Sequence, residues 1–378
     1  MNAAPRALGI DPGTVSFDVC GREGERLFLD RTLSTAEVGR HPDVLIDVLR
    51  AAGPVDLIVG PSGYGLPWVG VADLGPRETD LMLLGDAGER PPGATIVGGM
   101  GRIMRALRES GLPVCFAPGV IHLASVPEPR KVNRIDMGTA DKLCAVALGI
   151  WDQARRFTVP YAETSFIYVE LGGAFTAVIA VEDGAVVDGA GGTSGAMGYS
   201  AAGALDGEVA YLMRGFAKCS LASGGVAWVA GAPDAAPDAL AAASGDRLVS
   251  LAWEAFLEDV VKRVAAEMTV LDAPREVLLS GRLSRVPWVE EQVSGRLARF
   301  AAVRRVEGYA EVAKEAAQGA ALIGQGLVGG PLEELVEAMR LRDARGTVLD
   351  HLYVDEMDDL RGRYRQSEPG PAPFWERR

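Results

Sequence analysis

Cysteine and positive charge are both scarce in this 378-residue sequence. The four cysteines lie far apart and form no C-x-x-C pair, so neither a disulfide framework nor a cysteine metal or cluster site is indicated. We expect reduced, mostly buried thiols and a cytoplasmic protein. Lysine and arginine number 38 against 51 aspartates and glutamates, a net charge of −13. That balance disfavours nucleic acid and anionic membranes as partners.

Long apolar runs are also missing. The longest, at residues 143–151, is too short to span a membrane. The first residues show no charged segment followed by an apolar one, so no signal peptide is predicted. Apolar residues nevertheless make up 48% of the chain, enough for sizeable cores. A chain of this length predicts two domains, and the Pro- and Gly-rich stretch 367–378 predicts a frayed tail.

One pattern occurs twice in the chain. Near the start the sequence reads GIDPGTVSFDV, and past the middle it reads YVELGGAFTAVI. Aligning Asp11 with Glu170 superimposes Gly13 on Gly172 and brings the flanking apolar residues into register. Each copy has an apolar strand, an acidic residue, a tight glycine turn and a second strand. The repeat predicts two similar hairpins, one in each half of the chain.

Two such hairpins facing each other across a cleft can hold a polyphosphate and its Mg²⁺. Glycine lacks a Cβ, so its backbone N–H can approach phosphate closely, and carboxylates hold the water shell of the metal. We therefore predict Asp11 and Glu170 as catalytic residues that bind Mg²⁺, partly through water. For the first copy, an Asp-Pro-Gly turn that only caps a strand is the alternative. The predicted phosphate contacts are Gly13, Thr14, Gly172, Gly173 and Thr176.

Hydrophobic periodicity predicts an α/β chain. Strands are expected at 7–10, 17–19, 26–28, 55–60, 113–116 and 276–280, with a turn at 21–24 and a hairpin at Asp183-Gly184. Helices are expected at 42–52, 100–110, 138–156, 248–271, 311–327 and 332–342, and 230–244 is expected to be a surface excursion. The restart of the pattern near residue 165 predicts domains at 1–160 and 161–330, followed by a C-terminal helix and flexible tail at 331–378.

The two hairpins and a later strand–Ser–Gly–Arg turn ending at Arg282 resemble the superfamily of acetate and sugar kinases, heat-shock ATPases and actin (ASKHA). The resemblance covers residues 6–328. It implies two duplicated ribonuclease-H-like, actin-like ATPase domains around a nucleotide cleft, with ATP and Mg²⁺ as cofactors. It also implies that Gly281 lies where adenosine binds. Arg282 either contacts adenine or phosphate, or is simply exposed.

A second, narrower resemblance indicates the class of molecule that accepts the phosphoryl group. The stretches 170–173, 186–188 and 204–207 resemble butyrate kinases, and the phrase KVNRIDMGTADK at 131–142 resembles a group of archaeal and bacterial proteins called predicted butyrate kinases. That resemblance implies an ATP-dependent kinase that converts a small carboxylate into an acyl phosphate. A kinase of a small hydroxylated metabolite stays open. So does an ATPase switch that reactivates or assembles a partner enzyme.

The sequence departs from these relatives at two places. Many relatives carry a basic residue shortly after the first glycine turn, where this chain has Ser16, Phe17 and Asp18. A cation that neutralises phosphate must therefore come from elsewhere in the chain. Acetate and butyrate kinases usually have histidine where this chain has Glu170.

Asp141 is the predicted catalytic carboxylate on the acceptor side. It lies in Gly-Thr-Ala-Asp-Lys, just inside a predicted helix, and a similar Gly-Ala-Asp-Arg phrase marks the active site of one class of pantothenate kinases. It could accept the proton of a hydroxyl acceptor or orient the nucleophile. A carboxylate acceptor needs no base, because it is already ionised at neutral pH. The alternative is a first-turn acid that is favoured by the helix dipole.

Acceptor binding is predicted for Ser62, Tyr64 and Arg134. The first two follow a predicted strand, where open α/β sheets place ligand contacts, although loop strain would also explain the glycines and prolines around them. Arg134 belongs to a basic cluster with Arg130 and Lys131 that is either an anion grip or a solvated loop. The expected partner is a small-molecule acceptor, and a homodimer stays open.

Overall fold

The structure is a computed structural model that describes residues 4–13, 16–61, 63–84, 96–215, 217–355 and 357–364. The chain divides into two compact units, the first formed by residues 1–135, 139–162 and 308–378 and the second by 136–138 and 163–307. Residues 308–330, which the sequence placed with the second domain, thus return to the first unit. The predicted tail at 367–378 lies outside the described residues.

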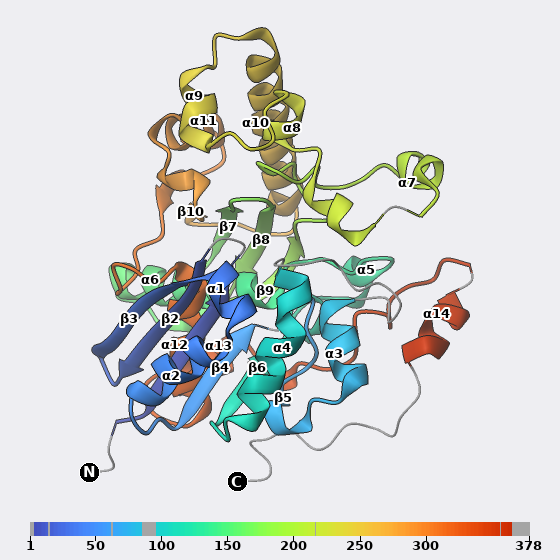
Figure 1. Cartoon of the computed structure of the whole chain (residues 1–378). Helices are drawn as coiled ribbons and strands as arrows, with labels where there is room; N and C mark the ends of the chain where they lie inside the picture. Colours follow the sequence, from blue (N-terminus) through green and yellow to red (C-terminus); the bar gives the residue numbers. More distant parts are fainter. Residues whose placement is uncertain are drawn as a thin grey trace. The chain divides into compact units, whose positions relative to one another are not determined.

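The first unit is built on a six-stranded mixed sheet in the order β3-β2-β1-β4-β6-β5 (Figure 1). The first three strands form an antiparallel meander, and β4 and β6 run parallel to β1. The strands are β1 (Arg6–Pro12), β2 (Ser16–Glu23), β3 (Arg26–Ser34), β4 (Leu57–Pro61), β5 (Val69–Gly70) and β6 (Val114–Ala117). Its helices are α1 (Thr35–Arg40), α2 (Asp43–Ala51), α3 (Pro76–Leu83), α4 (Ile96–Glu109), α5 (Glu128–Lys131), α6 (Ala140–Phe157), α12 (Glu315–Leu327), α13 (Glu333–Ala338) and α14 (Met357–Tyr364).

Helix α12 packs against both the sheet and α6. Its small residues allow very close contact, because a Cβ on Gly9 of β1 would lie 2.0 Å from the carbonyl O of Ala317. On the other side, a Cβ on Gly319 would lie 1.7 Å from the carbonyl O of Cys144 in α6. The alanine- and glycine-rich sequence of α12 thus serves backbone-to-backbone packing at the core of the first unit.

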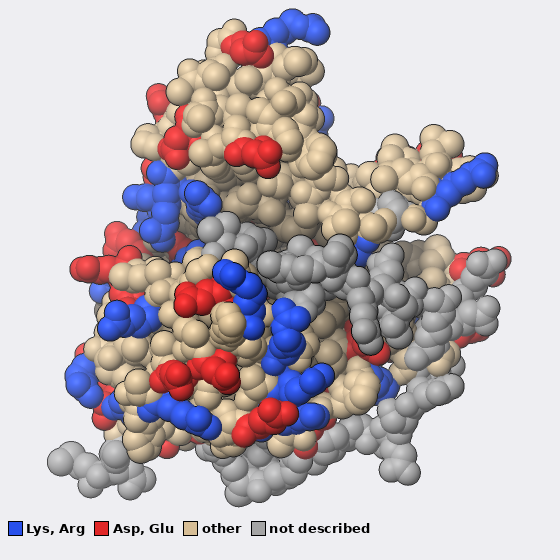
Figure 2. Space-filling view, in the orientation of Figure 1, with Lys and Arg blue, Asp and Glu red and all other residues tan. Residues whose placement is uncertain are grey.

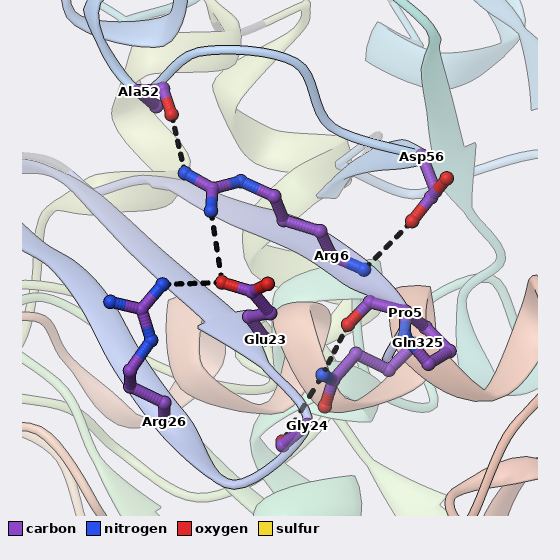
Figure 3. Close-up of polar contacts among 8 residues, drawn as sticks. All are labelled: Pro5, Arg6, Glu23, Gly24, Arg26, Ala52, Asp56 and Gln325. Carbon is purple, nitrogen blue, oxygen red and sulfur yellow. Dashed lines mark hydrogen bonds and ion pairs between the residues drawn. The ribbon is translucent and has the colours of Figure 1, made fainter. Parts of the chain in front are cut away.

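The far end of β1 is tied to its neighbours by polar contacts (Figure 3). Arg6 donates to the carbonyl O of Ala52 at 2.6 Å and to Oε2 of Glu23 at 3.0 Å. Gln325 of α12 donates from Nε2 to the carbonyl oxygens of Pro5 and Gly24, at 2.8 and 3.2 Å. These contacts fix the start of the β1–β2 hairpin, whose opposite end carries Asp11.

The second unit has a five-stranded sheet in the order β11-β10-β7-β8-β9. Its buried core is formed largely by α10 lying on the sheet, with Trp253 and Phe256 completely covered. The strands are β7 (Phe166–Leu171), β8 (Thr176–Glu182), β9 (Ala185–Ala190), β10 (Glu276–Ser280) and β11 (Ala302–Arg305). The helices are α7 (Gly207–Met213), α8 (Val226–Val229), α9 (Pro237–Ala242), α10 (Arg247–Met268) and α11 (Pro287–Leu297).

The two sheets repeat one topology. In each, the first three strands of the unit form an antiparallel meander, and two later strands add in parallel beside the first. The first unit adds only β5 at its edge. This confirms the predicted fold class, an α/β chain with duplicated actin-like ATPase folds.

Three local expectations were wrong. The turn expected at residues 21–24 is displaced to Gly24 and Glu25, because β2 continues to Glu23 with an irregularity at Gly21, which packs against Phe28. The stretch 230–244 is not simply a surface excursion, because Leu240 of α9 is buried in the second core. The helix expected from residue 311 begins at Glu315.

The cysteines are as the sequence predicts. All four cysteines are free, and all but Cys219 are buried. Within the described part of the chain, no helix combines the length and apolarity needed to cross a bilayer. On the face of the first unit that Figure 2 presents, acidic and basic side chains are interspersed rather than gathered by sign.

Candidate functional site

The first glycine hairpin joins β1 to β2 and places Asp11 at the end of a buried strand. Gly13 donates its N–H to the carbonyl O of Asp11 at 3.1 Å, and Thr35 donates its hydroxyl to the carbonyl O of Gly13 at 2.7 Å. A Cβ on Gly13 would lie 2.8 Å from the carbonyl O of Ser16. The turn therefore has room only for glycine. Thr14 lies outside the described residues.

The Asp11 carboxyl group is the most strongly perturbed acid of this hairpin. It is 7% exposed, and no side-chain hydrogen bond to it is found in the described part of the chain. Burial, followed by the negative charge of Asp141, raises the pKa of Asp11 to about 7, against the opposing pull of Lys314 and Lys142. A buried carboxylate without donors is costly, so the site favours a cation or a proton at Asp11.

Asp141 lies in the first turn of α6, as predicted. Thr139 donates its hydroxyl to Oδ1 of Asp141 at 2.5 Å, and the Lys142 ammonium lies 2.7 Å from Oδ2. Burial opposes ionisation, but the Lys142 charge and these hydrogen bonds hold the pKa of Asp141 below its usual value. The pKa values of the two carboxyl groups therefore differ. Asp141 is ionised, whereas Asp11 retains a proton more readily.

The predicted acceptor loop is joined to the start of α6. Ala140 donates its N–H to the carbonyl O of Gly63 at 2.9 Å, and Tyr64 donates its N–H to the carbonyl O of Met82 at 3.1 Å. Gly63 has φ +66°, which favours glycine. Tyr64 therefore belongs to a loop that is bonded next to Asp141. Ser62 lies outside the described residues.

The predicted basic cluster does not act as a unit. Lys131 is buried and donates from Nζ to the carbonyl O of Leu123 at 2.7 Å, so it stabilises its own loop. Burial lowers the pKa of Lys131. Arg134 is exposed, and no contact within the described residues joins its side chain to Asp141 or Tyr64. Its role in acceptor binding stays a prediction.

Lys314 is the residue of this site that the sequence did not reveal. Its Nζ lies 3.0 Å from Oδ2 of Asp18, which is 1% exposed and directly opposite Asp11 in the β1–β2 pair. A Cβ on Gly13 would lie 2.6 Å from the same Nζ. The only sequence signal was indirect, namely the absence of a basic residue after the first glycine turn.

The second hairpin, between β7 and β8, gathers the predicted residues of the second unit. Gly172 donates its N–H to the carbonyl O of Phe175 at 2.9 Å, closing the turn. The half-buried Glu170 pairs in register with Ser280 of β10, which places Gly281 against the hairpin. A Cβ on Gly281 would lie 3.1 Å from Cγ of Glu170. The sequence motifs at 170–176 and 280–282 thus lie next to each other, at the place where β7 and β10 end.

Two further predicted residues flank this hairpin. Arg282 is exposed, and a Cβ on Gly173 would lie 3.8 Å from its Cδ. Thr176 is fully buried, and its hydroxyl has no hydrogen-bond partner among the residues that the structure describes. Contact of Thr176 with phosphate stays a prediction.

Asp136 is a second residue that sequence reasoning missed, although it lies within the quoted phrase at 131–142. Its buried carboxylate accepts hydrogen bonds from the N–H and hydroxyl of Thr193, both at 2.9 Å, and from the N–H of Gly138 at 3.2 Å. Its carbonyl O accepts from the N–H of Gly191 at 3.0 Å. Asp136 therefore shapes the loop that follows β9.

The Asp11 hairpin would suit a Mg²⁺ ion that is bound mainly by water and phosphate. In the described ranges, no group of three or more His, Cys, Asp or Glu side chains could hold a metal by itself. Mg²⁺ needs no such cage, because it usually binds through one or two carboxylates, several waters and substrate phosphates. The buried Asp11 carboxyl fits that requirement.

The fold is shared with solved carboxylate kinases. A propionate kinase from Francisella tularensis subsp. tularensis SCHU S4 is similar with a TM-score of 0.57 and 15% identity, covering 83% of this chain and 98% of the kinase. An acetate kinase from Porphyromonas gingivalis gives 0.52 and 16%, covering 79% and 88%. One from Entamoeba histolytica gives 0.54 and 10%, covering 78% and 86%. The likeness establishes the ASKHA fold.

The family is shown by the sequence itself. The chain belongs to the family described as "Protein of unknown function (DUF1464)", whose sequence model matches residues 9–354. No curated protein gives a significant match to the chain.

Proposed function

We propose that the protein is an ATP-dependent phosphotransferase that phosphorylates a small carboxylate to an acyl phosphate. The observation that carries the proposal is the Asp11 centre, where a buried carboxyl with a raised pKa lies in a glycine hairpin together with the charges of Asp141, Lys142 and Lys314. The fold shared with acetate and propionate kinases supports the same activity.

The nucleotide would use both hairpins. Backbone N–H groups of Gly13, Gly172 and Gly173 would bind phosphate oxygens, and Gly281 would face adenosine. Asp11 and Glu170 would hold Mg²⁺, partly through water. Bound Mg²⁺ would supply charge neutralisation on the phosphates. The contribution of the chain is positioning and electrostatic stabilisation, as in other phosphoryl transfers.

The state of Asp141 favours a carboxylate acceptor. Its pKa is held below the usual value, so it is a weak base, and a carboxylate acceptor needs none. Asp141 would then orient the acceptor, and the Lys142 ammonium would offset the negative charge that the acceptor brings. Tyr64, whose loop is bonded to the start of α6, is the proposed neighbouring contact.

A kinase of a small hydroxylated metabolite is the second candidate. The observation that favours it is the presence of an ionised carboxylate, Asp141, at a helix start within the electrostatic reach of Asp11. In that reaction Asp141 would accept the hydroxyl proton.

The test is a metabolite screen for acceptor-dependent ADP release, with the product identified by mass. Hydroxylamine distinguishes the candidates, because it traps acyl phosphates as hydroxamates and leaves phosphate esters intact. A carboxylate that yields a hydroxamate supports the proposal, and a phosphate ester supports the second candidate. ATP hydrolysis that no metabolite stimulates would point to an ATPase switch. Absence of Mg-ATP binding would reject all three.

A further inference from the structure

The first hairpin carries more negative charge than its own strands can balance. Asp11 and Asp18 face each other across β1 and β2, so their side chains share one face of the sheet. Neither strand has a basic residue beside the turn, where Ser16 and Phe17 follow the glycine turn. A phosphate chain arriving here would meet carboxylates unless a cation from another segment is present.

Lys314 supplies that cation from the last segment of the first unit. Its Nζ forms one ion pair within the described residues, at 3.0 Å from Oδ2 of Asp18. An ammonium has three donors, and the side chain is 37% exposed, so further donors are accessible to a ligand. The same Nζ lies against Gly13, where a Cβ would be only 2.6 Å away. Because Gly13 has no side chain, there is room beside it for the Lys314 ammonium.

The segment that leads to Lys314 is held rigidly. Asp30 of β3 accepts hydrogen bonds from the backbone N–H groups of Glu311, Val312 and Ala313, at 2.9, 2.9 and 2.7 Å. These bonds fix residues 311–313 to β3, directly before α12 begins at Glu315.

The side chain of Gln318 braces the same segment from inside α12. It is 2% exposed, accepts from the N–H of Tyr309 at 2.7 Å and donates to the carbonyl O of Ala313 at 2.7 Å. The backbone at Lys314 is therefore held in place by hydrogen bonds with both Asp30 and Gln318. Such fixed placement is what electrostatic stabilisation of a transferring phosphoryl group requires.

We propose that Lys314 is the phosphate-binding cation of the first hairpin and takes the place of the basic residue that is missing after the glycine turn. This inference rests on the proposed nucleotide-binding function. Asp18 and Ser16 position the ammonium, since the Ser16 hydroxyl donates to Oδ2 of Asp18 at 3.0 Å. The competing explanation is that Lys314 only neutralises the buried Asp18.

Calorimetric titration with Mg-ATP separates the two explanations. Lys314→Met should weaken binding about 10- to 100-fold, the usual value of a charge-assisted hydrogen bond to phosphate. Lys262→Met is the matched control, because Lys262 also forms a lysine–carboxylate pair, 2.6 Å from Glu258 on the exposed face of α10. The control should bind like the wild type.

Lys314→Met leaves the buried Asp18 carboxylate without its ion-pair partner, and this alone can disturb folding. The double variant Asp18→Asn/Lys314→Met removes both charges. We expect it to unfold like the wild type and still to bind Mg-ATP weakly. Wild-type affinity in both the single and the double variant, or recovery of affinity in the double variant alone, would overturn the role of Lys314. Failure of the wild-type protein to bind Mg-ATP would instead overturn the proposed function.

Discussion

Gly281 lies directly against the backbone of Leu171, so closely that a Cβ at position 281 would be 2.5 Å from the carbonyl O of Leu171. The contact follows from the parallel pairing of β10 with β7, which ends with Ser280 beside Glu170. Gly281 also has φ +83°. The turn after β10 and the second glycine hairpin are therefore parts of one rigid structure.

Gly281→Ala should disrupt this structure. The backbone conformation and the clash with Leu171 together should lower the free energy of unfolding by about 1–3 kcal/mol, the usual cost of a strained backbone conformation. Binding of Mg-ATP should weaken at the same time. Chemical denaturation and calorimetry measure the two effects. Gly295→Ala on α11 is the control, since a Cβ there meets nothing within 4 Å, and it should raise stability by about 0.5–1 kcal/mol. Equal behaviour of the two variants would contradict the proposed packing role.

Asp11→Asn should separate stability from turnover. The substitution removes a carboxyl group whose ionised form is disfavoured by burial and by the charge of Asp141, so stability near pH 8 should be unchanged or higher. Mg-dependent ATP turnover should fall by at least about 100-fold, because the group that positions the metal is lost. The control is Asp47→Asn at an exposed position of α2, which should leave turnover intact. Near-normal turnover in Asp11→Asn would remove this residue from the site.

Asp141→Asn should distinguish acceptor classes. For a hydroxyl acceptor the maximal rate should fall about 10²- to 10⁴-fold, the contribution of a general base. For a carboxylate acceptor the loss should be smaller and should appear partly as a higher KM for the acceptor. If Asp141 is only a helix-start acid, kinetics should persist and stability should fall by about 0.3–1 kcal/mol. Steady-state kinetics with the identified acceptor, together with a denaturation curve, decide among these outcomes.

His122 should make the protein sensitive to acid. It is 1% exposed, its Nε2 has no hydrogen-bond partner among the described residues, and burial lowers its pKa to about 4. The unfolded chain then binds more protons than the native state between about pH 6.5 and pH 4, so stability falls as the pH drops through that range. Asp11 acts in the opposite sense over part of this range, because burial raises its pKa to about 7 and the native state then binds the proton first. Urea denaturation at pH 7.5 and pH 5 therefore measures the contribution of His122 as the difference between the wild type and a variant without this histidine.

His122→Gln should be less destabilised than the wild type on going from pH 7.5 to pH 5, because the histidine that titrates differently in the two states is gone while Asp11 remains. Exposed His41→Gln controls for loss of a histidine as such. An unchanged difference between the two pH values in His122→Gln would assign the acid sensitivity to other groups. The same variant should retain ATP turnover where it remains folded, because His122 is buried rather than part of the proposed site.

The fold class and both glycine hairpins could be predicted because their signals are local. A strand, an acidic residue and a glycine turn lie within about a dozen residues, and the period of the apolar positions reveals the strands without any knowledge of distant contacts. The repeat between Asp11 and Glu170 then indicated the duplicated sheets. The start of α6 beside Asp141 was predicted for the same reason.

The remaining features depend on contacts between segments that are far apart in the chain. Lys314 reaches Asp18 only because α12 packs on β1 and β2, and that packing is set by small residues on both elements. The segment before α12 is likewise held from a distance, because the Asp30 carboxylate, 283 positions away in the chain, accepts the N–H of Ala313. The sequence by itself determined the two glycine hairpins and the lack of a basic residue directly after the first. Only the tertiary structure decided which lysine lies beside that hairpin, because this depends on the packing of α12 rather than on any local pattern.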